Sequence, residues 1–174
     1  MTNAYTFDDR FEIVRFERCA VSVRAKRNVS VSEVDALMIL RRSFEVTDHR
    51  QYVVLLVVDN ITDITAGARY ALSSSRNVLA AAMLGRGAMD EVLAAPYLHA
   101  VYPGEYFTEE AAAMQWLAVM HDLVCADPVP HALSLTVDLD PFRPRKPRMA
   151  PPGPGSASPG DRRSMSSSDL ERAG

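Results

Sequence analysis

The chain has 174 residues, an apolar content of 48% and a formal net charge of −3, which suffices for one hydrophobic core and an appended segment. No apolar run approaches the ~20 residues that span a bilayer, so stable membrane insertion is not expected. Residues 1–138 carry 12 Lys and Arg against 18 Asp and Glu, and this acidic balance disfavours nucleic acid as a partner.

The first third of the sequence predicts two strands followed by a helix. Apolar and polar residues alternate loosely over residues 5–31, which favours two strands joined by a turn near Glu17 and Arg18. Ser32, with Asp35 three residues later, is typical of a helix N-cap, so we expect a helix over residues 33–46. Its buried stripe is predicted to comprise Val34, Leu37, Met38, Arg41 and Phe44.

A continuous apolar run at residues 53–58 is typical of a central strand that is covered on both faces. Asp59 and Asn60 follow directly and favour a turn, because such side chains bond to their own backbone. Thr65 is a natural cap for a short helix over residues 66–74. The chain is therefore predicted to cross from a strand to a helix here.

The remaining elements continue the alternation of strands and helices. A second buried strand is predicted at residues 78–84. The Gly85-Arg86-Gly87 segment after it favours a tight turn between strand and helix, with an anion-binding site as the alternative. We expect a helix over residues 88–95, a short strand at 106–107, a strong helix capped by Thr108, and a late strand at 133–137. The stripe of the strong helix is predicted to comprise Ala113, Trp116, Leu117 and Met120.

The end of the chain has a different composition. Seven of the eleven prolines follow Asp140, with Gly, Ser and Arg between them, and such a segment buries too little apolar surface to offset its ordering entropy. We therefore predict an α/β domain over residues 5–138 and a disordered Pro-, Ser- and Arg-rich tail over residues 139–174.

Three stretches together resemble the SpoIIAA-like, or STAS, family of small α/β domains. They are the run ending in Val57-Val58-Asp59 with the Thr65-Ala66-Gly67 that follows, the Ala-rich residues 79–84, and Tyr106-Phe107-Thr108-Glu109-Glu110 leading to Trp116-Leu117. The chain looks most like bacterial STAS-like or lipid-carrier-like single domains of unassigned function. The resemblance implies a mixed β-sheet flanked by about four helices.

The same resemblance implies a docking or switch loop. In sigma-factor regulators of this family a partner kinase phosphorylates the Ser of an Asp-Ser pair at the start of the helix after the central strand, and the added charge breaks a docking surface. The matching residues here are Asp63-Ile64-Thr65, in which Ile64 interrupts the pair. The implied loop comprises Asp59, Asn60, Asp63 and Thr65, with a kinase or an anti-sigma-like protein as partner, although helix capping alone also explains Thr65.

Signatures of catalysis and of metal binding are missing from the sequence. There is no nucleophile elbow, phosphate-binding loop, dinucleotide fingerprint or His-Glu-x-x-His motif, and Asp59 and Asp63 have no catalytic partner near them in sequence. The four histidines are scattered in the sequence, which favours surface or capping roles; they are His49, His99, His121 and His131. The two cysteines, Cys19 and Cys125, are too few for a four-Cys zinc site. Neither a metal nor a cofactor is expected.

The sequence thus predicts a noncatalytic bacterial regulatory or protein-interaction domain. The first residues lack a basic region followed by an apolar stretch, so we expect a cytoplasmic location. One alternative stays open, a carrier of a lipid or other apolar small molecule. It would need a cavity lined by residues such as Met38, Phe44, Met83 and Trp116.

Overall fold

The computed structural model of the chain describes residues 4–7, 10–26 and 28–133. The predicted tail, the domain boundary at residue 138 and all but the first residue of the predicted strand at 133–137 lie outside these residues.

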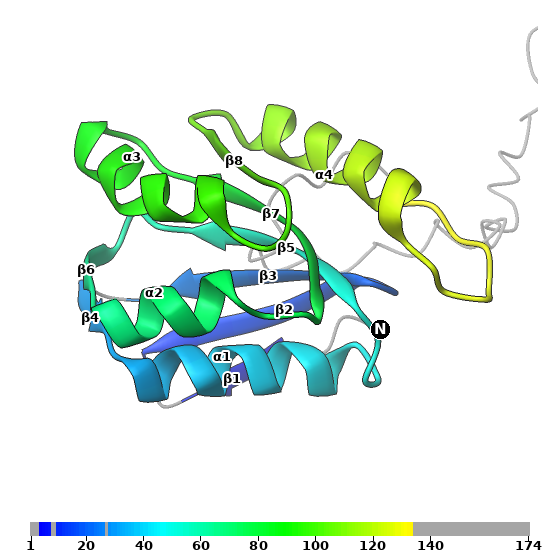
Figure 1. Ribbon diagram of the computed structural model, residues 1–174, viewed down its shortest axis with the longest axis horizontal. Coiled ribbons are helices and arrows are strands. Elements are labelled where there is room, and N and C mark those ends of the chain that lie inside the picture. The colour runs from blue at the N-terminus through cyan, green and yellow to red at the C-terminus, as the bar shows by residue number, and fades with distance from the viewer. Residues whose placement is uncertain (1–3, 8–9, 27, 134–174) are drawn as a thin grey trace, which may run out of the picture. The chain divides into compact units, whose positions relative to one another are not determined.

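A six-stranded mixed sheet in the order β1-β2-β3-β5-β7-β8 forms the frame of the domain (Figure 1). β2 runs antiparallel to both of its neighbours, β1 and β3, whereas β3, β5, β7 and β8 are parallel neighbours. The strands are β1 Ala4–Phe7, β2 Phe11–Glu17, β3 Ala20–Ala25, β5 Tyr52–Val57, β7 Val78–Leu84 and β8 Gly104–Phe107. The predicted mixed sheet is confirmed, and its parallel strands end at one common edge.

Helices cover both faces of this sheet (Figure 1). Residues of α1 (Glu33–Val46), α2 (Ala66–Ser73), α3 (Ala88–Ala94) and the short 3₁₀ helix η1 (Ala95–His99) share one apolar core, and α4 (Glu110–Val124) packs in a second core on the other face. The predicted set of four flanking helices is therefore confirmed. Within the described part of the chain, no helix combines the length and the apolar character needed to cross a membrane.

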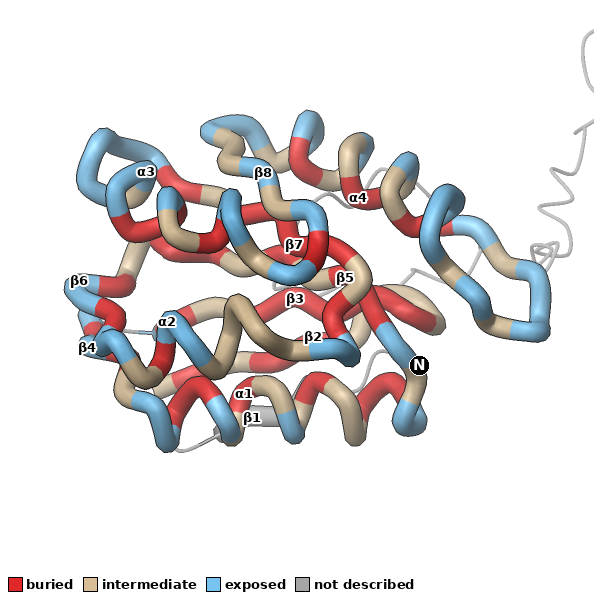
Figure 2. The backbone as a smooth tube through the Cα atoms, viewed as in Figure 1, coloured by how far each residue is buried: buried red, intermediate tan, exposed pale blue. Residues whose placement is uncertain are grey.

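β5 is the central strand that its apolar run predicts. Val53, Leu55 and Val57 point into the core beneath α4, while Val54 and Leu56 pack against the core on the α1 side. Neighbours on both sides, β3 and β7, complete its hydrogen bonding. Figure 2 colours the residues of β5 as buried or intermediate along the whole strand.

α1 begins as predicted but buries a different face. Ser32 and Asp35 form the expected capping box. The predicted stripe is wrong over its first turns, because Val34 is 69% exposed and Leu37 is 53% exposed, whereas Phe44 packs partly buried against the core. The buried hydrophobic and small residues of the helix are instead Ala36, Ile39, Ser43 and Val46. Their spacing also fits one helical face, and the small side chains at positions 36 and 43 allow a close approach to the core.

α4 also departs from its predicted start. Its N-cap is Glu109, which makes no side-chain capping bond, so the predicted cap at Thr108 is wrong. Ala113 and Leu117 are buried as expected, and the same line along the helix continues to His121. Trp116, expected in the core, is only half-buried at its edge, with its ring 5.8 Å from that of Phe107.

Three short strands were not predicted, namely β1 at the edge of the main sheet and two strands that form a separate pair. β4 (Val29–Val31) and β6 (Ile61–Ile64) pair in parallel to form a separate two-stranded sheet. This pair lies beside the first turns of α1 and α2 (Figure 1). It therefore gives regular structure to the segment that the sequence treats as a loop.

Candidate functional site

The predicted switch loop is divided by the fold. Asp59 and Asn60 form a turn after β5, Asp63 lies in β6, and Thr65 caps α2. The turn at Asp59 and Asn60, expected from their side chains, is confirmed. The four residues therefore occupy two neighbouring places, one at the carboxyl edge of the main sheet and one on the outer side of β6.

Asp59 lines a polar hollow of about 150 Å³ at the carboxyl edge of the parallel strands. Its carboxylate lies 3.6 Å from the guanidinium of Arg86, and its Oδ1 atom is buried with no hydrogen-bond partner among the described residues. Arg24, Thr108 and Glu110 complete the charged and polar lining. The hollow can hold several waters or a small polar group. Its lining offers the carboxylates of Asp59 and Glu110 and the hydroxyl of Thr108, and no Ser, Cys, His or Lys is among the described residues that line it.

Asn60 has a structural role. Its side-chain amide donates a 2.9 Å hydrogen bond to the backbone carbonyl of Ala25. The backbone carbonyl of Asn60 accepts a hydrogen bond from the backbone N–H of Val29 at 3.0 Å. These bonds join the end of β3 to the turn after β5. They also position β4 for pairing with β6.

Asp63 and Thr65 are exposed on the outer side of the β4–β6 pair. Asp63 accepts a hydrogen bond from the Ser30 hydroxyl at 3.3 Å and lies 4.0 Å from the guanidinium of Arg69. The Thr65 hydroxyl accepts from the backbone N–H of Ala68 at 3.3 Å, which confirms the predicted cap. An exposed hydroxyl at a helix start is accessible to a modifying enzyme.

The Gly85-Arg86-Gly87 segment is the tight turn that its sequence allows. The Asp90 carboxylate accepts hydrogen bonds from the backbone N–H groups of Arg86 and Gly87, at 2.7 and 3.2 Å. A side chain of the chain itself thus occupies the place that an anion would take. Gly85 is required here, since a Cβ atom would lie 2.5 Å from that of Asp90 and 2.8 Å from the Tyr106 hydroxyl.

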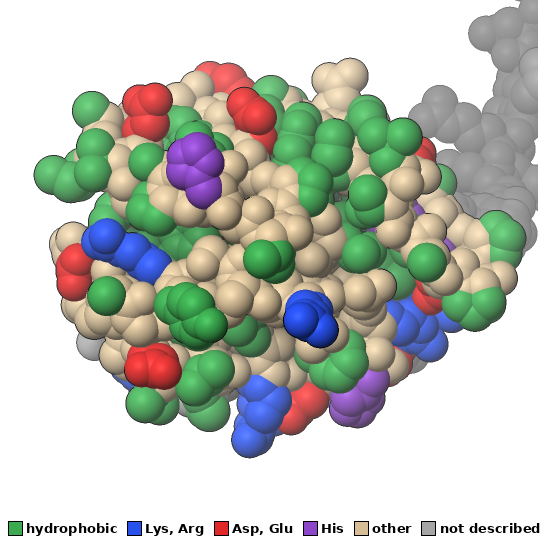
Figure 3. All heavy atoms as spheres, in the orientation of Figure 1, with side chains coloured by type: hydrophobic (Ala, Val, Ile, Leu, Met, Phe, Trp, Pro, Cys, Tyr) green, Lys and Arg blue, Asp and Glu red, His purple; other side chains and the backbone are tan. Residues whose placement is uncertain are grey.

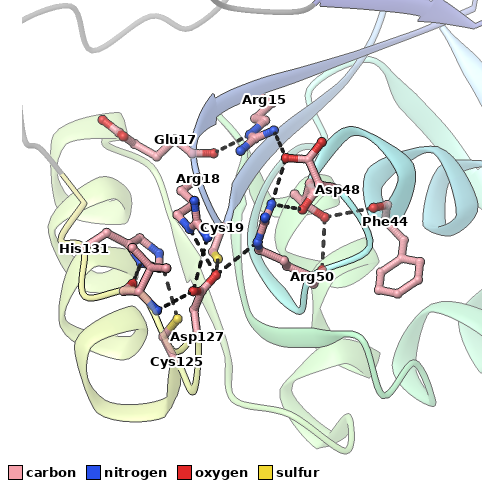
Figure 4. Close-up of polar contacts among 12 residues, drawn as sticks. Arg15, Glu17, Arg18, Cys19, Phe44, Asp48, Arg50, Cys125, Asp127 and His131 are labelled. Atoms are coloured by element: carbon pink, nitrogen blue, oxygen red, sulfur yellow. Dashed lines mark hydrogen bonds and ion pairs between the residues drawn. The ribbon is translucent and has the colours of Figure 1, made fainter.

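A second group of functional side chains meets at the opposite, amino-terminal edge of the sheet (Figure 4). Cys19 lies in the turn before β3, His121 on α4, Cys125 at the end of α4, and His131 in the segment that follows. Their sulfur and nitrogen atoms all lie within 4.8 Å of one another. Cys19 and His121 are buried, and the other two are half-buried. Two thiols and two imidazoles at such distances are chemically able to bind a metal ion.

Asp127 organises the surroundings of this group. Its carboxylate accepts hydrogen bonds from the Arg18 side chain at 3.1 Å and from the Val129 backbone N–H at 2.8 Å. The Oδ2 atom also lies 3.2 Å from Arg50 Nε and 3.7 Å from Cys19 Sγ (Figure 4). The hydrogen bond from Arg18 and the one from Val129 hold the pKa of Asp127 at about 2. Burial, with Cys125 nearby, raises the pKa of the Cys19 thiol to about 12.

Comparison with known proteins identifies the family. A family model described as a domain of unknown function, DUF7793, matches residues 17–121, which is more than half of the chain. The chain belongs to the DUF7793 family. Within this DUF7793 domain the match includes the whole segment from Asp59 to Thr65, as well as Cys19 and His121, and it ends before Cys125 and His131.

Solved structures similar to this DUF7793 chain include one described by its fold. It is the crystal structure of an uncharacterized protein of the DUF3478 family with a SpoIIAA-like fold, from Shewanella loihica PV-4. The two are 12% identical, with 67% of this chain and 92% of that chain covered and a TM-score of 0.42. No curated protein matches the chain significantly.

Sequence reasoning missed the cysteine and histidine group of this DUF7793 chain. His121 was expected at the surface or at a cap, yet it is only 1% exposed. A partial signal was present, since His121 and Cys125 are four residues apart and share one helix face, with His131 six residues further on. Cys19 is a hundred residues away in sequence, so only the fold brings the four together.

Proposed function

We propose that this chain is a noncatalytic docking domain that binds a protein partner through one surface. That surface, called here the α1–α2 face, comprises Val34, Leu37, Asp63, Thr65 and Tyr70. The observation that carries the proposal is the exposure of its three large apolar side chains, which is 69% for Val34, 53% for Leu37 and 75% for Tyr70. Exposed apolar side chains gathered beside polar ones are typical of protein-interaction sites.

The fold supports the α1–α2 face with rigid elements. The helix starts lie together, because a Cβ atom at Gly67 of α2 would be only 2.6 Å from the carboxylate of Glu33 in α1. The backbone N–H of Thr65 donates to the carbonyl of Val31, which ties the start of α2 to β4. Figure 3 shows hydrophobic side chains among charged ones over α1 and α2. A surface held in this way is preorganised for docking.

Thr65 is suited to regulate such a surface. Phosphate on its hydroxyl would add about −1.5 to −2 charges beside Asp63. The start of α2 and the guanidinium of Arg69, one helical turn later, would offset part of this repulsion. The expected result is an intact fold with an altered docking surface, as the resemblance to sigma-factor regulators implies, and a kinase or an anti-sigma-like protein is the partner class that fits.

The cavities give the alternative of an apolar carrier no support. Two apolar cavities of the described residues hold about 30 and about 20 Å³, whereas sites for drug-sized ligands are roughly 300–1,000 Å³. Of the residues that a carrier cavity was expected to use, Met83 lines the larger one, while Met38, Phe44 and Trp116 do not. A lipid chain would therefore require either of these two cavities to widen.

Site-specific photo-crosslinking in the native host tests the docking proposal. A photoreactive amino acid is placed at Leu37 or Tyr70, and as matched controls at Val119 or Leu123, which are equally exposed apolar positions on α4 across the sheet. We expect one and the same protein adduct from the two α1–α2 positions and none from the two controls. Identical adducts from all four positions, or none from Leu37 and Tyr70, would contradict the proposal.

A further inference from the structure

Two imidazoles meet nitrogen to nitrogen at the amino-terminal edge of the sheet. Nε2 of His121 lies 3.0 Å from Nε2 of His131. The other ring nitrogens face oxygens that only accept hydrogen bonds, because His131 Nδ1 is 2.8 Å from the carbonyl of Val129 and His121 Nδ1 is 3.3 Å from the carboxylate of Asp122. These acceptors favour the tautomer with the hydrogen on Nδ1, and in that tautomer each ring presents a lone pair at Nε2.

With hydrogen on both Nδ1 atoms, this arrangement favours a positive charge at its centre. Two lone pairs that face each other at 3.0 Å repel unless a proton or a cation lies between the rings. The sulfur atoms of the two cysteines join the same centre, with Cys125 Sγ 3.9 Å from His131 Nε2 and all four atoms within 4.8 Å. Four electron-pair donors around one point favour a metal ion over a single proton.

We propose that Cys19, His121, Cys125 and His131 bind one Zn²⁺ in a tetrahedral site. Zinc bonds of about 2.0–2.1 Å to nitrogen and 2.3 Å to sulfur place tetrahedral ligand atoms roughly 3.3–3.8 Å apart. The distances of 3.0 and 3.9 Å lie close to this range. Two thiolates and two imidazoles are a common zinc ligand set. Three of the four ligands lie close together in the sequence, in the order His-x₃-Cys-x₅-His.

The surroundings suit a bound zinc ion. Both Nδ1 atoms have an oxygen acceptor, which orients each ring with Nε2 toward the metal as in established histidine sites. Asp127 does not compete as a ligand, since Arg18, Arg50 and the Val129 N–H already engage its oxygens. A hollow of about 190 Å³, lined in part by His121, Cys125 and His131, provides a path for the ion to enter.

The site would be structural. All four positions are protein ligands, which leaves no open position for a reacting water. The ligands come from the turn before β3, from α4 and from the segment after it, so zinc would fasten residues 125–131 to the sheet. Leu133, just beyond His131, is buried in the core beneath α4 and would be held there by the same attachment. This inference is independent of the docking proposal.

Metal content and Co²⁺ spectroscopy of the full chain test the zinc site. The parent is compared with Cys125→Ser, with His131→Gln, and with His99→Gln as a control on an exposed histidine far from the cluster in sequence. Purified from zinc-supplemented cells, the parent and the control should hold about one zinc per chain, and the two site variants below about a tenth of that. The Co²⁺ form of the parent should show thiolate charge-transfer absorption and the intense visible bands of tetrahedral coordination.

His131 is half-buried in an irregular segment, so His131→Gln should fold, as far-ultraviolet circular dichroism will verify. The proposal is overturned if His131→Gln retains as much zinc as His99→Gln, or if Co²⁺ shows the weak bands of octahedral coordination. The proposal is overturned equally if freshly prepared protein holds no zinc and contains a Cys19–Cys125 disulfide. It is also overturned if such protein holds no zinc and has free thiols with two histidines that bind protons.

Discussion

Replacement of Thr65 tests whether this residue acts only as a helix cap or also as a docking switch. Thr65→Ala removes the hydroxyl that accepts from the Ala68 N–H at 3.3 Å. This bond is long and exposed, so the loss should fall at the low end of the range for caps, about 0.5–1 kcal/mol. The backbone bond from the Thr65 N–H to Val31 remains, and the β4–β6 pair should therefore persist in the variant.

Thr65→Asp retains a capping oxygen and adds a negative charge at the start of α2. The helix dipole favours this charge by about 0.3–1 kcal/mol, while Asp63, two residues away, opposes it by a comparable amount. We expect the stability of Thr65→Asp to stay within roughly 0.5 kcal/mol of the parent. The Asp variant should thus be at least as stable as the Ala variant.

Urea unfolding and photo-crosslinking from Tyr70 are measured on the parent and both variants. If Thr65 lies on the docking surface, Thr65→Asp lowers the crosslinking yield despite its near-normal stability, and Thr65→Ala retains most of it despite its lower stability. A yield that simply follows stability across the three proteins would show that Thr65 is a cap and not a switch. A loss above about 3 kcal/mol in Thr65→Ala would refute the structural reasoning itself.

Three further predictions concern the fold. Leu117→Ala should lower the free energy of unfolding by about 2–5 kcal/mol because Leu117 is fully buried, whereas the exposed Val119→Ala should cost under about 0.5 kcal/mol; equal losses in urea would disprove the placement of α4. Burial alone would raise the pKa of Asp35, but hydrogen bonds from Ser32 and the ion pair with Arg10 lower it overall. Asp35→Asn should therefore be less stable at neutral pH by about 1–3 kcal/mol. The difference should shrink as the pH falls below about 4, through the lowered folded pKa, and a constant difference down to pH 2 would contradict this assignment. Removal of residues 141–174, a proline-dense segment, should leave the melting temperature within a few degrees of the parent by calorimetry, and a larger drop would show that these residues stabilise the domain.

The elements that the sequence predicted well are those with strong local signals. The apolar run of β5 and the cap at Ser32 each lie within a few consecutive residues, and both have the predicted structure. The predicted face of α1 was wrong in its first half because two neighbouring stripes fit the helical period there, and the residues of the predicted one, Val34 and Leu37, are exposed. Only the packing against α2 and the sheet selects between such stripes.

The features that the sequence did not reveal depend on contacts between distant segments. β4 and β6 have three and four residues and pair across more than thirty positions, so neither carries a strand signal of its own. The four metal-binding candidates were treated singly for the same reason, since Cys19 reaches His121 only through the packing of α4 on the sheet. Asp59 and Asn60 looked like part of one loop with Thr65, and β6 separates them.

The most direct test of the docking account is hydrogen exchange of the domain with and without the partner identified by crosslinking from Tyr70. Bound partner should slow exchange in β6, in α2 and in the first turns of α1, and leave α4 unchanged. Protection confined to α4, or to the hollow lined by Arg24, Asp59 and Arg86, would contradict docking through the α1–α2 face.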